Sequence, residues 1–320
     1  MTDDLRFNRR KLLGAGAVVG AAALLGDTAT AGGEPAAAAK PKTTPFSNVN
    51  GSAVLPADRL GLMLYTVRDQ VANLGFAKVL EAVAGMGFKT VEFAGYTQGT
   101  GAITTKQIKK LLDANGLKGV GCHGNLDDAA IKAAVELDLP YTGTAFEIPR
   151  DTTTAGWEQL AADYNAFGKK ASKHGVKGYL HIHGPAYGPV ADNPLVRGLD
   201  VLLEHTDPKY FNFQMDIYWA YFFQTPFPGY DPIEYVRKNR KRFPLFHVKD
   251  GQKDPKGGYA SGQFADVGQG AIPFEEFFTK VGGPKVSYYL NERDNADTHP
   301  WGSLCSAQAS YLYMRYGLRR

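Results

Sequence analysis

Three strand-like apolar runs in the C-terminal half of the chain each deliver a side chain that can bind a cation. Asp216, His247 and Glu292 stand at or near the ends of these runs, which begin close to residues 211, 245 and 287. Carboxylates and imidazoles are common ligands of divalent metals. An ionised carboxylate without a partner inside a protein costs several kcal/mol, and a shared cation is the simplest partner for two of them. The three residues therefore predict a metal site, with a purely hydrogen-bonded polar cluster as the alternative.

Further polar residues lie on the same predicted strands or on an earlier one. Lys249 shares a face with His247, because side chains alternate along a strand. It could protonate a substrate, stabilise an oxyanion or form a surface salt bridge. His181 and His183 share a face of an earlier strand, with His183 nearer the end. We expect His183 to serve as an additional ligand or catalytic group, whereas a structural hydrogen bond is the preferred role of His181.

The elements that must position these residues alternate regularly from residue 58 onward. Short apolar strands are predicted at residues 61–65, 90–93, 117–122, 141–145, 178–183, 211–217, 245–249 and 287–291. Helices are predicted at residues 74–86, 105–114, 128–137, 157–174, 195–204, 232–240, 274–281 and 306–316. Parallel strands need crossover connections, so this alternation predicts a parallel sheet. We predict an α/β protein with a single (β/α)8 TIM barrel, whose chemistry lies at the C-terminal ends of the strands.

The N-terminus predicts export. Arg9 and Arg10 precede an Ala- and Gly-rich apolar stretch that ends near Leu25, and Ala29-Thr30-Ala31 has the small-x-small pattern of a cleavage site. This arrangement resembles a twin-arginine signal, with an uncleaved anchor as the alternative. The apolar stretch is too short to favour a permanent membrane span of about 20 residues. We expect a signal peptide at 1–31, a flexible linker at 32–57 and the barrel at 58–320, in a periplasmic or extracellular protein.

The bulk composition argues against some classes of binding partner. The net charge is +4, and no dense Lys/Arg stripe with interleaved aromatics occurs, which argues against nucleic-acid binding. No Gly-x-Gly-x-x-Gly motif follows the first predicted strand, which argues against a dinucleotide-binding fold. Cys122 and Cys305 should lie far apart around a closed barrel, so we expect two free thiols. The sequence leaves a monomer and a homo-oligomer both open.

Three motifs resemble those of the sugar phosphate isomerase/epimerase family of xylose-isomerase-like barrels. They are Leu62-Met63-Leu64-Tyr65-Thr66-Val67-Arg68, Asp216-Ile217-Tyr218-Trp219-Ala220 and His247-Val248-Lys249-Asp250. The resemblance runs from about residue 60 to the C-terminus. It implies that Asp216, His247 and Glu292 bind a divalent cation (Mn, Zn, Co, Fe or Mg). It also implies a sugar substrate and proton transfer next to a carbonyl, with Glu292, or His183 with Lys249, moving the proton.

The chain departs from the family at the fifth strand. The family carries His-Asn-His-x-x-Glu-Phe there, and its Glu is both a fourth ligand and one member of an acid/base pair. Here the segment is His181-Ile182-His183-Gly184-Pro185-Ala186-Tyr187, so Ala186 replaces the Glu. An imidazole ligand from His183 in its place would favour borderline metals over Mg.

The resemblance also suggests sugar-binding residues and three functional hypotheses. His123, Arg68, Trp219 and Tyr218 are candidates to bind the sugar, by hydrogen bonds or by ring stacking. Structural packing, hydrogen bonding or ion pairing is the alternative for each. We expect a sugar isomerase or epimerase. A metal-dependent lyase or hydrolase acting on 3-keto-glycosides and a non-catalytic periplasmic sugar-binding barrel are the alternatives.

Three further polar residues stand near the ends of predicted strands, with weaker indications of function. Glu92 could bind sugar or pair with Arg68 at the barrel mouth. Glu147, at the end of the fourth strand, could supply a carboxylate or cap a loop. Asp294 has no assigned role.

Overall fold

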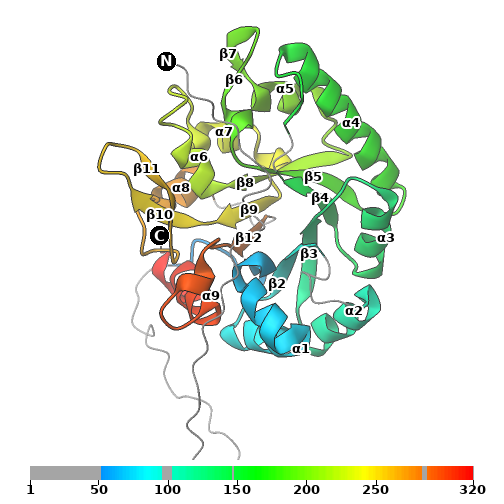
Figure 1. The fold of residues 1–320 in the computed structure, drawn as a ribbon, viewed down its shortest axis with the longest axis vertical. Helices are drawn as coiled ribbons and strands as arrows, with labels where there is room; N and C mark the ends of the chain where they lie inside the picture. The colour runs from blue at the N-terminus through cyan, green and yellow to red at the C-terminus, as the bar shows by residue number, and fades with distance from the viewer. Residues whose placement is uncertain (1–51, 96–102, 146–147, 283–286, 320) are drawn as a thin grey trace, which may run out of the picture. The chain divides into compact units, whose positions relative to one another are not determined.

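A closed barrel of eight parallel strands forms the centre of the protein, in a computed structural model that describes residues 52–95, 103–145, 148–282 and 287–319 (Figure 1). Going round the barrel, the strand order is β1-β12-β9-β8-β5-β4-β3-β2. The bounds are β1 Leu60–Met63, β2 Thr90–Ala94, β3 Lys118–His123, β4 Tyr141–Ala145, β5 Lys177–Ile182, β8 Phe211–Asp216, β9 Leu245–Val248 and β12 Tyr288–Asn291. The predicted single (β/α)8 barrel is confirmed, with every barrel strand at its predicted place to within two residues.

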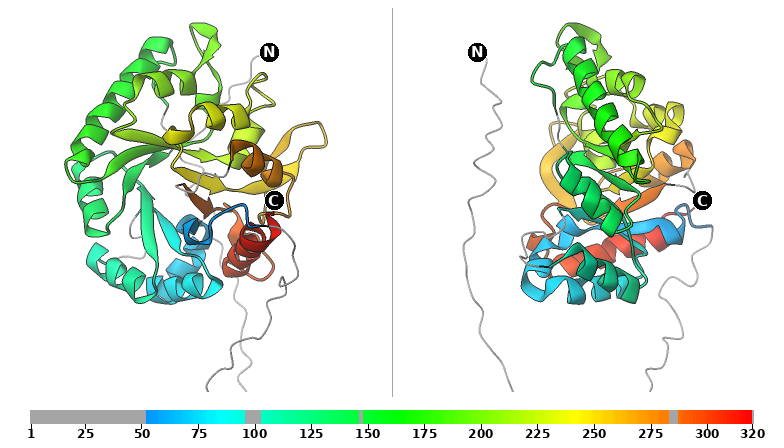
Figure 2. Two further views of the ribbon diagram at one scale, coloured as in Figure 1. Left: turned by 180° about the vertical axis from the view of Figure 1, so that it is seen from behind. Right: turned by 90° about the vertical axis from the view of Figure 1, so that its right-hand side faces the viewer.

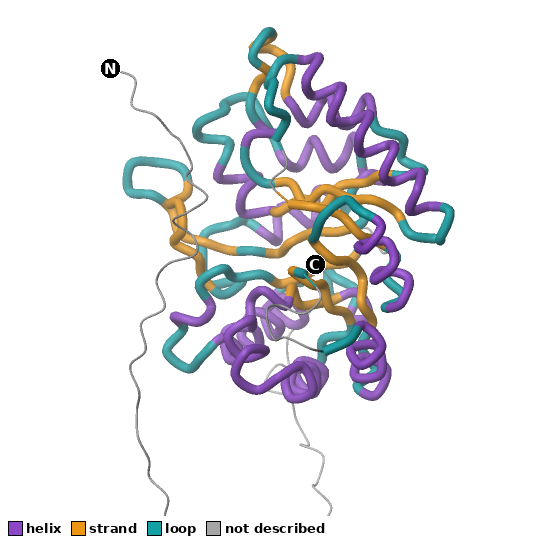
Figure 3. The backbone as a smooth tube through the Cα atoms, turned by 45° about the vertical axis from the view of Figure 1, so that its right-hand side comes forward, coloured by secondary structure: helices purple, strands orange, loops and turns teal. Residues whose placement is uncertain are grey.

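Helices surround the strands on the outside of the barrel, as Figures 2 and 3 show from further directions. They are α1 Arg68–Met86, α2 Thr105–Ala114, α3 Asp128–Glu136, α4 Thr154–Ser172, α5 Gly198–His205, α6 Ile217–Phe222, α7 Pro232–Lys238, α8 Phe274–Val281 and α9 Ser303–Leu312. Gly75 interrupts α1 with a φ of 77°, so the regular helix after it matches the predicted 74–86. No helix among the described residues combines the length and hydrophobicity that crossing a bilayer requires.

Local capping residues explain where several helices begin. The Thr104 side chain accepts a hydrogen bond from the Gln107 amide, and the Gln107 side chain accepts one from the Thr104 amide, so both satisfy a free helix-end donor. The side chains of Asp127 and Thr153 cap α3 and α4 by accepting one backbone amide each, without a reciprocal bond. These caps are sequence-local, which is why the starts of these helices were predictable to within a few residues.

The barrel interior changes character along the strands. Val120, Tyr179, Leu245 and Leu290 form a small apolar cluster inside the barrel. The inward side chains further along the strands are polar, beginning with the buried His247, whose strand partner in β12 is Leu290. A change from apolar to polar towards the C-terminal strand ends is the pattern expected when chemistry lies at that end.

Two β-hairpins and one helix were not predicted. The strands β6 (Pro189–Val190) and β7 (Asn193–Arg197) form one hairpin, so residues 195–197 extend into β7 rather than starting a helix. The strands β10 (Asp250–Lys253) and β11 (Tyr259–Ala265) form the other, directly after β9. The short helix α6 follows β8 without an intervening loop, because the Asp216 carboxylate accepts a hydrogen bond from the Trp219 amide and caps it.

The described chain begins inside the predicted linker. Val54 and Leu55 are buried against the barrel, and the Val54 amide donates a hydrogen bond to the Leu318 carbonyl. Packing of the chain therefore begins before residue 58, while the predicted signal at 1–31 lies outside the described residues. Cys122 is buried, Cys305 is exposed and both are free, which confirms the prediction of two free thiols.

Candidate metal centre

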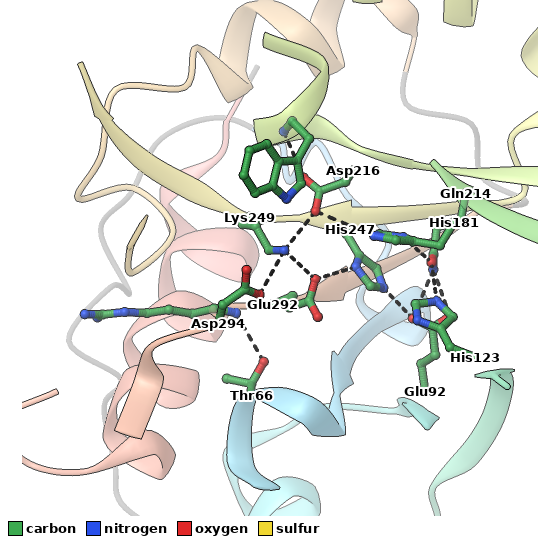
Figure 4. Close-up of polar contacts among 12 residues, drawn as sticks. Thr66, Glu92, His123, His181, Gln214, Asp216, His247, Lys249, Glu292 and Asp294 are labelled. Carbon is green, nitrogen blue, oxygen red and sulfur yellow. Dashed lines mark hydrogen bonds and ion pairs between the residues drawn. The ribbon is translucent and has the colours of Figure 1, made fainter. Parts of the chain in front are cut away.

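Lys249 lies at the centre of the polar cluster at the C-terminal strand ends (Figure 4). Its Nζ is 3.0 Å from Asp216 Oδ2, 2.7 Å from Glu292 Oε2 and 3.0 Å from Asp294 Oδ1. Lys249 is 1% exposed and Asp216 is fully buried, so these charges interact with little screening from water. Three carboxylates from two segments of the chain, one at the end of β8 and one after β12, thus converge on one cation.

His247 links this cluster to a second polar layer further inside the barrel, called the deeper layer. Its members are Glu92, Gln214, His123, His181 and Tyr179. The Nδ1 of His247 is 2.7 Å from Glu292 Oε2, and its Nε2 is 2.5 Å from Glu92 Oε2. Glu92 comes from β2 and is fully buried inside the barrel. Tyr179 donates a hydrogen bond to Glu92 Oε1 at 2.6 Å, and a Cβ at Gly121 would lie 2.9 Å from the same hydroxyl. Glycine at position 121 therefore leaves room for the buried Glu92 carboxylate and its partner.

Gln214 joins two more histidines to Glu92. Its Nε2 donates to both Glu92 oxygens, at 2.9 and 3.0 Å. Its Oε1 is 2.7 Å from His181 Nδ1 and 2.9 Å from His123 Nε2. A side-chain amide offers two donor hydrogens and one acceptor oxygen, so this orientation satisfies Glu92 and both imidazoles together.

Burial and neighbouring charges set the protonation states of the cationic groups. Burial acts against the charged form of His247, but Glu292 and Glu92 raise its pKa to about 10. Burial likewise opposes the Lys249 ammonium, yet Asp216, Asp294 and Glu292 hold its pKa well above the ordinary value. Both side chains are therefore cations at neutral pH in the metal-free protein.

The acids and the remaining histidines respond differently. Burial raises the pKa of Asp216 to about 6, with Lys249 acting in the opposite direction. Burial also acts to raise the pKa of Glu292, but Lys249 and His247 hold it well below the ordinary value. Burial, reinforced by nearby cations, lowers the pKa of His181 and of His183, so both imidazoles are neutral. A neutral imidazole keeps one ring nitrogen with a free lone pair, which metal binding requires.

The residues of the cluster fit a divalent cation. One ligand atom from each of His181, Asp216, His247 and Glu292 lies within 4.8 Å of the others, and all four side chains are buried. Asp216 Oδ2, although 3.0 Å from the Lys249 ammonium, has no hydrogen bond of acceptable geometry among the described residues. Two carboxylates with two imidazoles are a donor set for borderline metals such as Zn, Mn, Co or Fe. This buried group can therefore hold a metal ion.

Charge balance supports the same conclusion and identifies a competitor. When ionised, the four carboxylates of the site outnumber the Lys249 and His247 cations by two, which leaves a formal charge of −2. His247 must release its Nδ1 proton to act as a ligand, so a divalent ion would offset most of this negative charge. It would also have to displace the Lys249 ammonium from at least one carboxylate, because the two cations repel each other at such short range.

The structure brings the three predicted ligands together, but the fourth member of the group is not the histidine that the sequence predicts. Asp216, His247 and Glu292 belong to one group, and the strand-five member of that group is His181 rather than His183. The His183 ring instead lies between His181 and Trp219, with centroids 4.9 and 5.4 Å away. The predicted role of His183 as a ligand stays a prediction. Ala186 is buried in the short turn after β5 (Pro185–Tyr187) and offers no carboxylate.

The predicted sugar-binding residues lie in different settings. Trp219 is half-buried beside His183, and its indole Nε1 has no hydrogen-bond partner among the described residues. Tyr218 is fully buried, and its hydroxyl donates to the Ala260 carbonyl at 2.5 Å. His123 contacts the deeper layer through Gln214. The substrate-binding roles stay predictions, but the Tyr218 hydroxyl is already hydrogen-bonded to the β10–β11 hairpin.

The remaining candidates also differ from expectation. Arg68 begins α1, donates to the Tyr65 carbonyl at 2.8 Å and lies 3.6 Å from Asp297, so it does not pair with Glu92. Glu92 does not line the mouth as weighed from the sequence, because it is fully buried in the deeper layer. Asp294, which has no role assigned from the sequence, contacts Lys249, and its spacing of two from Glu292 is the pattern that places both side chains on one side. Glu147 lies outside the described residues.

The chain belongs to a family of barrels with this architecture. The family model described as xylose isomerase-like TIM barrel matches residues 80–292, so the chain is a member of that family. A search of curated proteins found no match.

Solved structures share the fold at low sequence identity. A sugar phosphate isomerase/epimerase from Parabacteroides distasonis is 19% identical with a TM-score of 0.65, and the match covers 87% of this chain and all of that one. A probable 3-DHS dehydratase from Bacillus anthracis is 14% identical with a TM-score of 0.57, covering 79% of this chain and 98% of that one. An AP endonuclease of family 2 from Brucella melitensis is 15% identical with a TM-score of 0.56, covering 79% and 97%. Identities this low establish the fold alone.

Proposed function

We propose that the protein is a metal-dependent enzyme that moves a proton next to a carbonyl group of a free or keto sugar, as an isomerase or epimerase does. The observation that carries the proposal is the convergence of Asp216, Glu292, His247 and Lys249 at one point of the barrel mouth. A divalent ion bound there would supply positive charge for two adjacent sugar oxygens as negative charge develops on them.

The chain's own residues supply the proton chemistry in this proposal. Glu292 is ionised and lies beside the cation site, so it can accept a proton from the sugar carbon. Lys249 is a buried ammonium that can donate a hydrogen bond to the developing oxyanion. Phe264 and Trp219, whose ring centroids are 6.1 Å apart, provide apolar surface on the side of Lys249. Such rings can stack on a sugar face and exclude water.

A lyase reaction on 3-keto-glycosides is the second candidate, and Ala186 favours it. The described site holds no carboxylate at the place where the family's second acid/base group stands. Epimerisation needs a proton donor on the opposite face of the sugar, whereas elimination needs one base and a departing group at the next carbon. The fold does not choose between the two, because a dehydratase and an isomerase/epimerase both share it.

Incubation with sugars and 3-keto-glycosides in deuterated water tests both candidates. Epimerisation leaves solvent deuterium in an intact sugar, whereas elimination releases the aglycone.

We expect Asp216→Asn to lose bound metal and turnover together, and Glu292→Gln to lower turnover by at least about 100-fold. Glu234→Gln is the matched control, because Glu234 is half exposed on α7 and its one ion pair within the described part of the chain is with Arg237. Ligand-induced stabilisation without any turnover, unchanged in Asp216→Ala, would instead identify a non-catalytic sugar-binding protein.

The proposal includes action outside the cytoplasm, on the strength of the Arg9-Arg10 segment and the apolar stretch after it. Phosphorylated sugars are mostly cytoplasmic, so the proposed substrate is unphosphorylated.

A further inference from the structure

The deeper layer of the site holds its two metal-facing histidines in defined orientations. Glu92 accepts a hydrogen bond from His247 Nε2 at 2.5 Å, which places a proton on that nitrogen. The other ring nitrogen, Nδ1, faces Glu292 at 2.7 Å. If Nδ1 loses its proton to solvent, its lone pair could coordinate a metal, while the proton on Nε2 would remain hydrogen-bonded to Glu92. A carboxylate behind a histidine commonly orients metal-binding imidazoles in this way.

Gln214 extends the same arrangement to His181. Its amide group must turn its NH₂ end to Glu92, because the opposite orientation would bring two oxygen acceptors together. Its oxygen then accepts a hydrogen bond from His181 Nδ1 at 2.7 Å. The proton of the neutral His181 ring is thereby placed on Nδ1. The lone pair remains on Nε2, which lies 3.9 Å from Asp216 Oδ2 on the cation side of the ring.

We propose that Glu92 and Gln214 are positioning residues of the metal centre, and that His181 is its ligand from strand five. Glu92 fixes the His247 tautomer directly and the His181 tautomer through Gln214. The His181 Nε2 lone pair then faces Asp216, and His247 Nδ1, once it has lost its proton, faces Glu292. His181 thus takes the place left by the carboxylate that Ala186 lacks. The inference rests on the proposed function only in requiring a bound cation, and it makes no use of the sugar.

The two residues can be exchanged without changing the charge of the layer, which gives a sharp test. In the double variant Glu92→Gln/Gln214→Glu, the new Glu accepts hydrogen bonds from His181 and His123 and receives the NH₂ group of the new Gln. The oxygen of the new Gln still accepts from His247. Each single replacement, Glu92→Leu or Gln214→Leu, removes an acceptor that no other described residue supplies to the same nitrogen.

Two readouts separate a positioning role from a merely structural one. Long-range ¹H–¹⁵N NMR of the metal-free protein at one fixed pH reports the His181 tautomer, and calorimetric titration with Zn²⁺ reports affinity. We expect the wild type to carry the His181 proton on Nδ1. Gln214→Leu should give a mixture of His181 tautomers and weaken Zn²⁺ binding by about 10- to 100-fold. Glu92→Leu should weaken Zn²⁺ binding to a similar extent. The exchanged double variant should recover most of the affinity and the Nδ1 tautomer.

Tyr179→Phe is the matched control, because it removes the 2.6 Å hydrogen bond to Glu92 but touches neither metal-facing nitrogen. We expect its His181 tautomer to be unchanged. A wild-type His181 protonated on Nε2, single variants that bind Zn²⁺ as the wild type does, or a wild type that binds no Zn²⁺ would each overturn the inference. If Zn²⁺ binding depends on Glu92 and Gln214 but no keto sugar reacts, this inference stands and the proposed function fails.

Discussion

Lys249 is the residue whose chemistry is most sensitive to its surroundings. Its ammonium contacts Asp216, Glu292 and Asp294, and it is almost entirely shielded from solvent. In the metal-free protein it acts as the cation that makes a buried group of carboxylates tolerable. The same position makes it both a competitor of a metal ion and, once displaced, a donor close to the reacting oxygens.

Lys249→Met separates these two effects. Removal of the ammonium leaves three carboxylates without their shared cation, so we expect the metal-free protein to lose about 3–5 kcal/mol of unfolding free energy. Affinity for Mn²⁺ or Zn²⁺ should rise by about 10-fold, because no ammonium then repels the ion. Urea unfolding in EDTA and calorimetric titration measure the two changes. Lys280→Met, which removes an exposed i,i+4 ion pair with Glu276, is the control. Unchanged or weaker metal binding in Lys249→Met would refute the competition.

His247 makes the stability of the metal-free protein dependent on pH. Its folded-state pKa of about 10 lies above the ordinary 6.5, so its charged form stabilises the fold fully below pH 6.5. This contribution is lost as the pH rises from 6.5 through 10. In EDTA, the difference in unfolding free energy between wild type and His247→Gln should therefore shrink between pH 7 and pH 10. Two parallel stability curves across that range would show that His247 is not held as an imidazolium.

At the scale of elements, one carboxylate ties the base of the β10–β11 hairpin to the loop that follows it. Asp250 is buried and accepts hydrogen bonds from four backbone amides, at 2.8 to 3.1 Å. The donors are the amides of Gly251, Gly268, Gly270 and Ile272. A Cβ at Gly270 would lie 2.2 Å from Asp250 Oδ1, so only glycine allows the chain to approach this closely. The hairpin in turn carries Phe264, whose ring is 5.5 Å from Lys249 Nζ.

Asp250→Ala should release this hairpin from the barrel. Hydrogen bonds to a charged group contribute about 1.5–3 kcal/mol each, but water can replace part of them, so we expect a net loss of about 3 kcal/mol. Trypsin should then cleave faster at the exposed Lys253 and Lys256. Asp254→Ala is the matched control in the same hairpin, since Asp254 accepts only the Lys256 amide through its side chain. Equal cleavage rates in the two variants would argue against an anchoring role for Asp250.

At the scale of the whole molecule, closure of the barrel brings distant segments to one point. Glu92 and His247 are 155 positions apart in the sequence, yet they share a hydrogen bond because β2 and β9 both face the barrel interior. An open sheet would leave these strands on separate faces or edges. The candidate metal centre is thus a property of the complete ring of strands rather than of any single βα unit.

Export of the whole chain is testable by replacing its two adjacent arginines. The double variant Arg9→Lys/Arg10→Lys should remain in the cytoplasm, because recognition of a twin-arginine signal depends on both side chains. Cell fractionation with an antibody to the barrel measures the distribution. Lys40→Arg/Lys42→Arg, a charge-preserving change in the predicted linker, is the control. Export of the Arg9/Arg10 variant at the wild-type level would exclude the twin-arginine route.

Local patterns in the sequence were enough to predict the barrel and three members of the buried group that could hold a metal ion. The β4 and α2 segments were predicted with their observed bounds, because alternation of apolar residues and helix caps act over a few neighbouring positions. Asp216, His247 and Glu292 were identified because parallel barrel strands all end at one rim. The two free thiols followed from the same topology.

Only the tertiary structure decided which side chains contact one another inside that rim. His181, rather than His183, joins the ligand group, and Glu92 lies in the deeper layer instead of at the mouth. These outcomes depend on how far each strand is shifted along the barrel relative to its neighbours, which no local pattern records. The β10–β11 hairpin was missed although residues 254–258 carry a turn signal, in which Gly257 and Gly258 have positive φ and the Asp254 side chain accepts the Lys256 amide. The placement of Lys249 between carboxylates is likewise a product of strand closure, because its three acidic partners come from other parts of the chain.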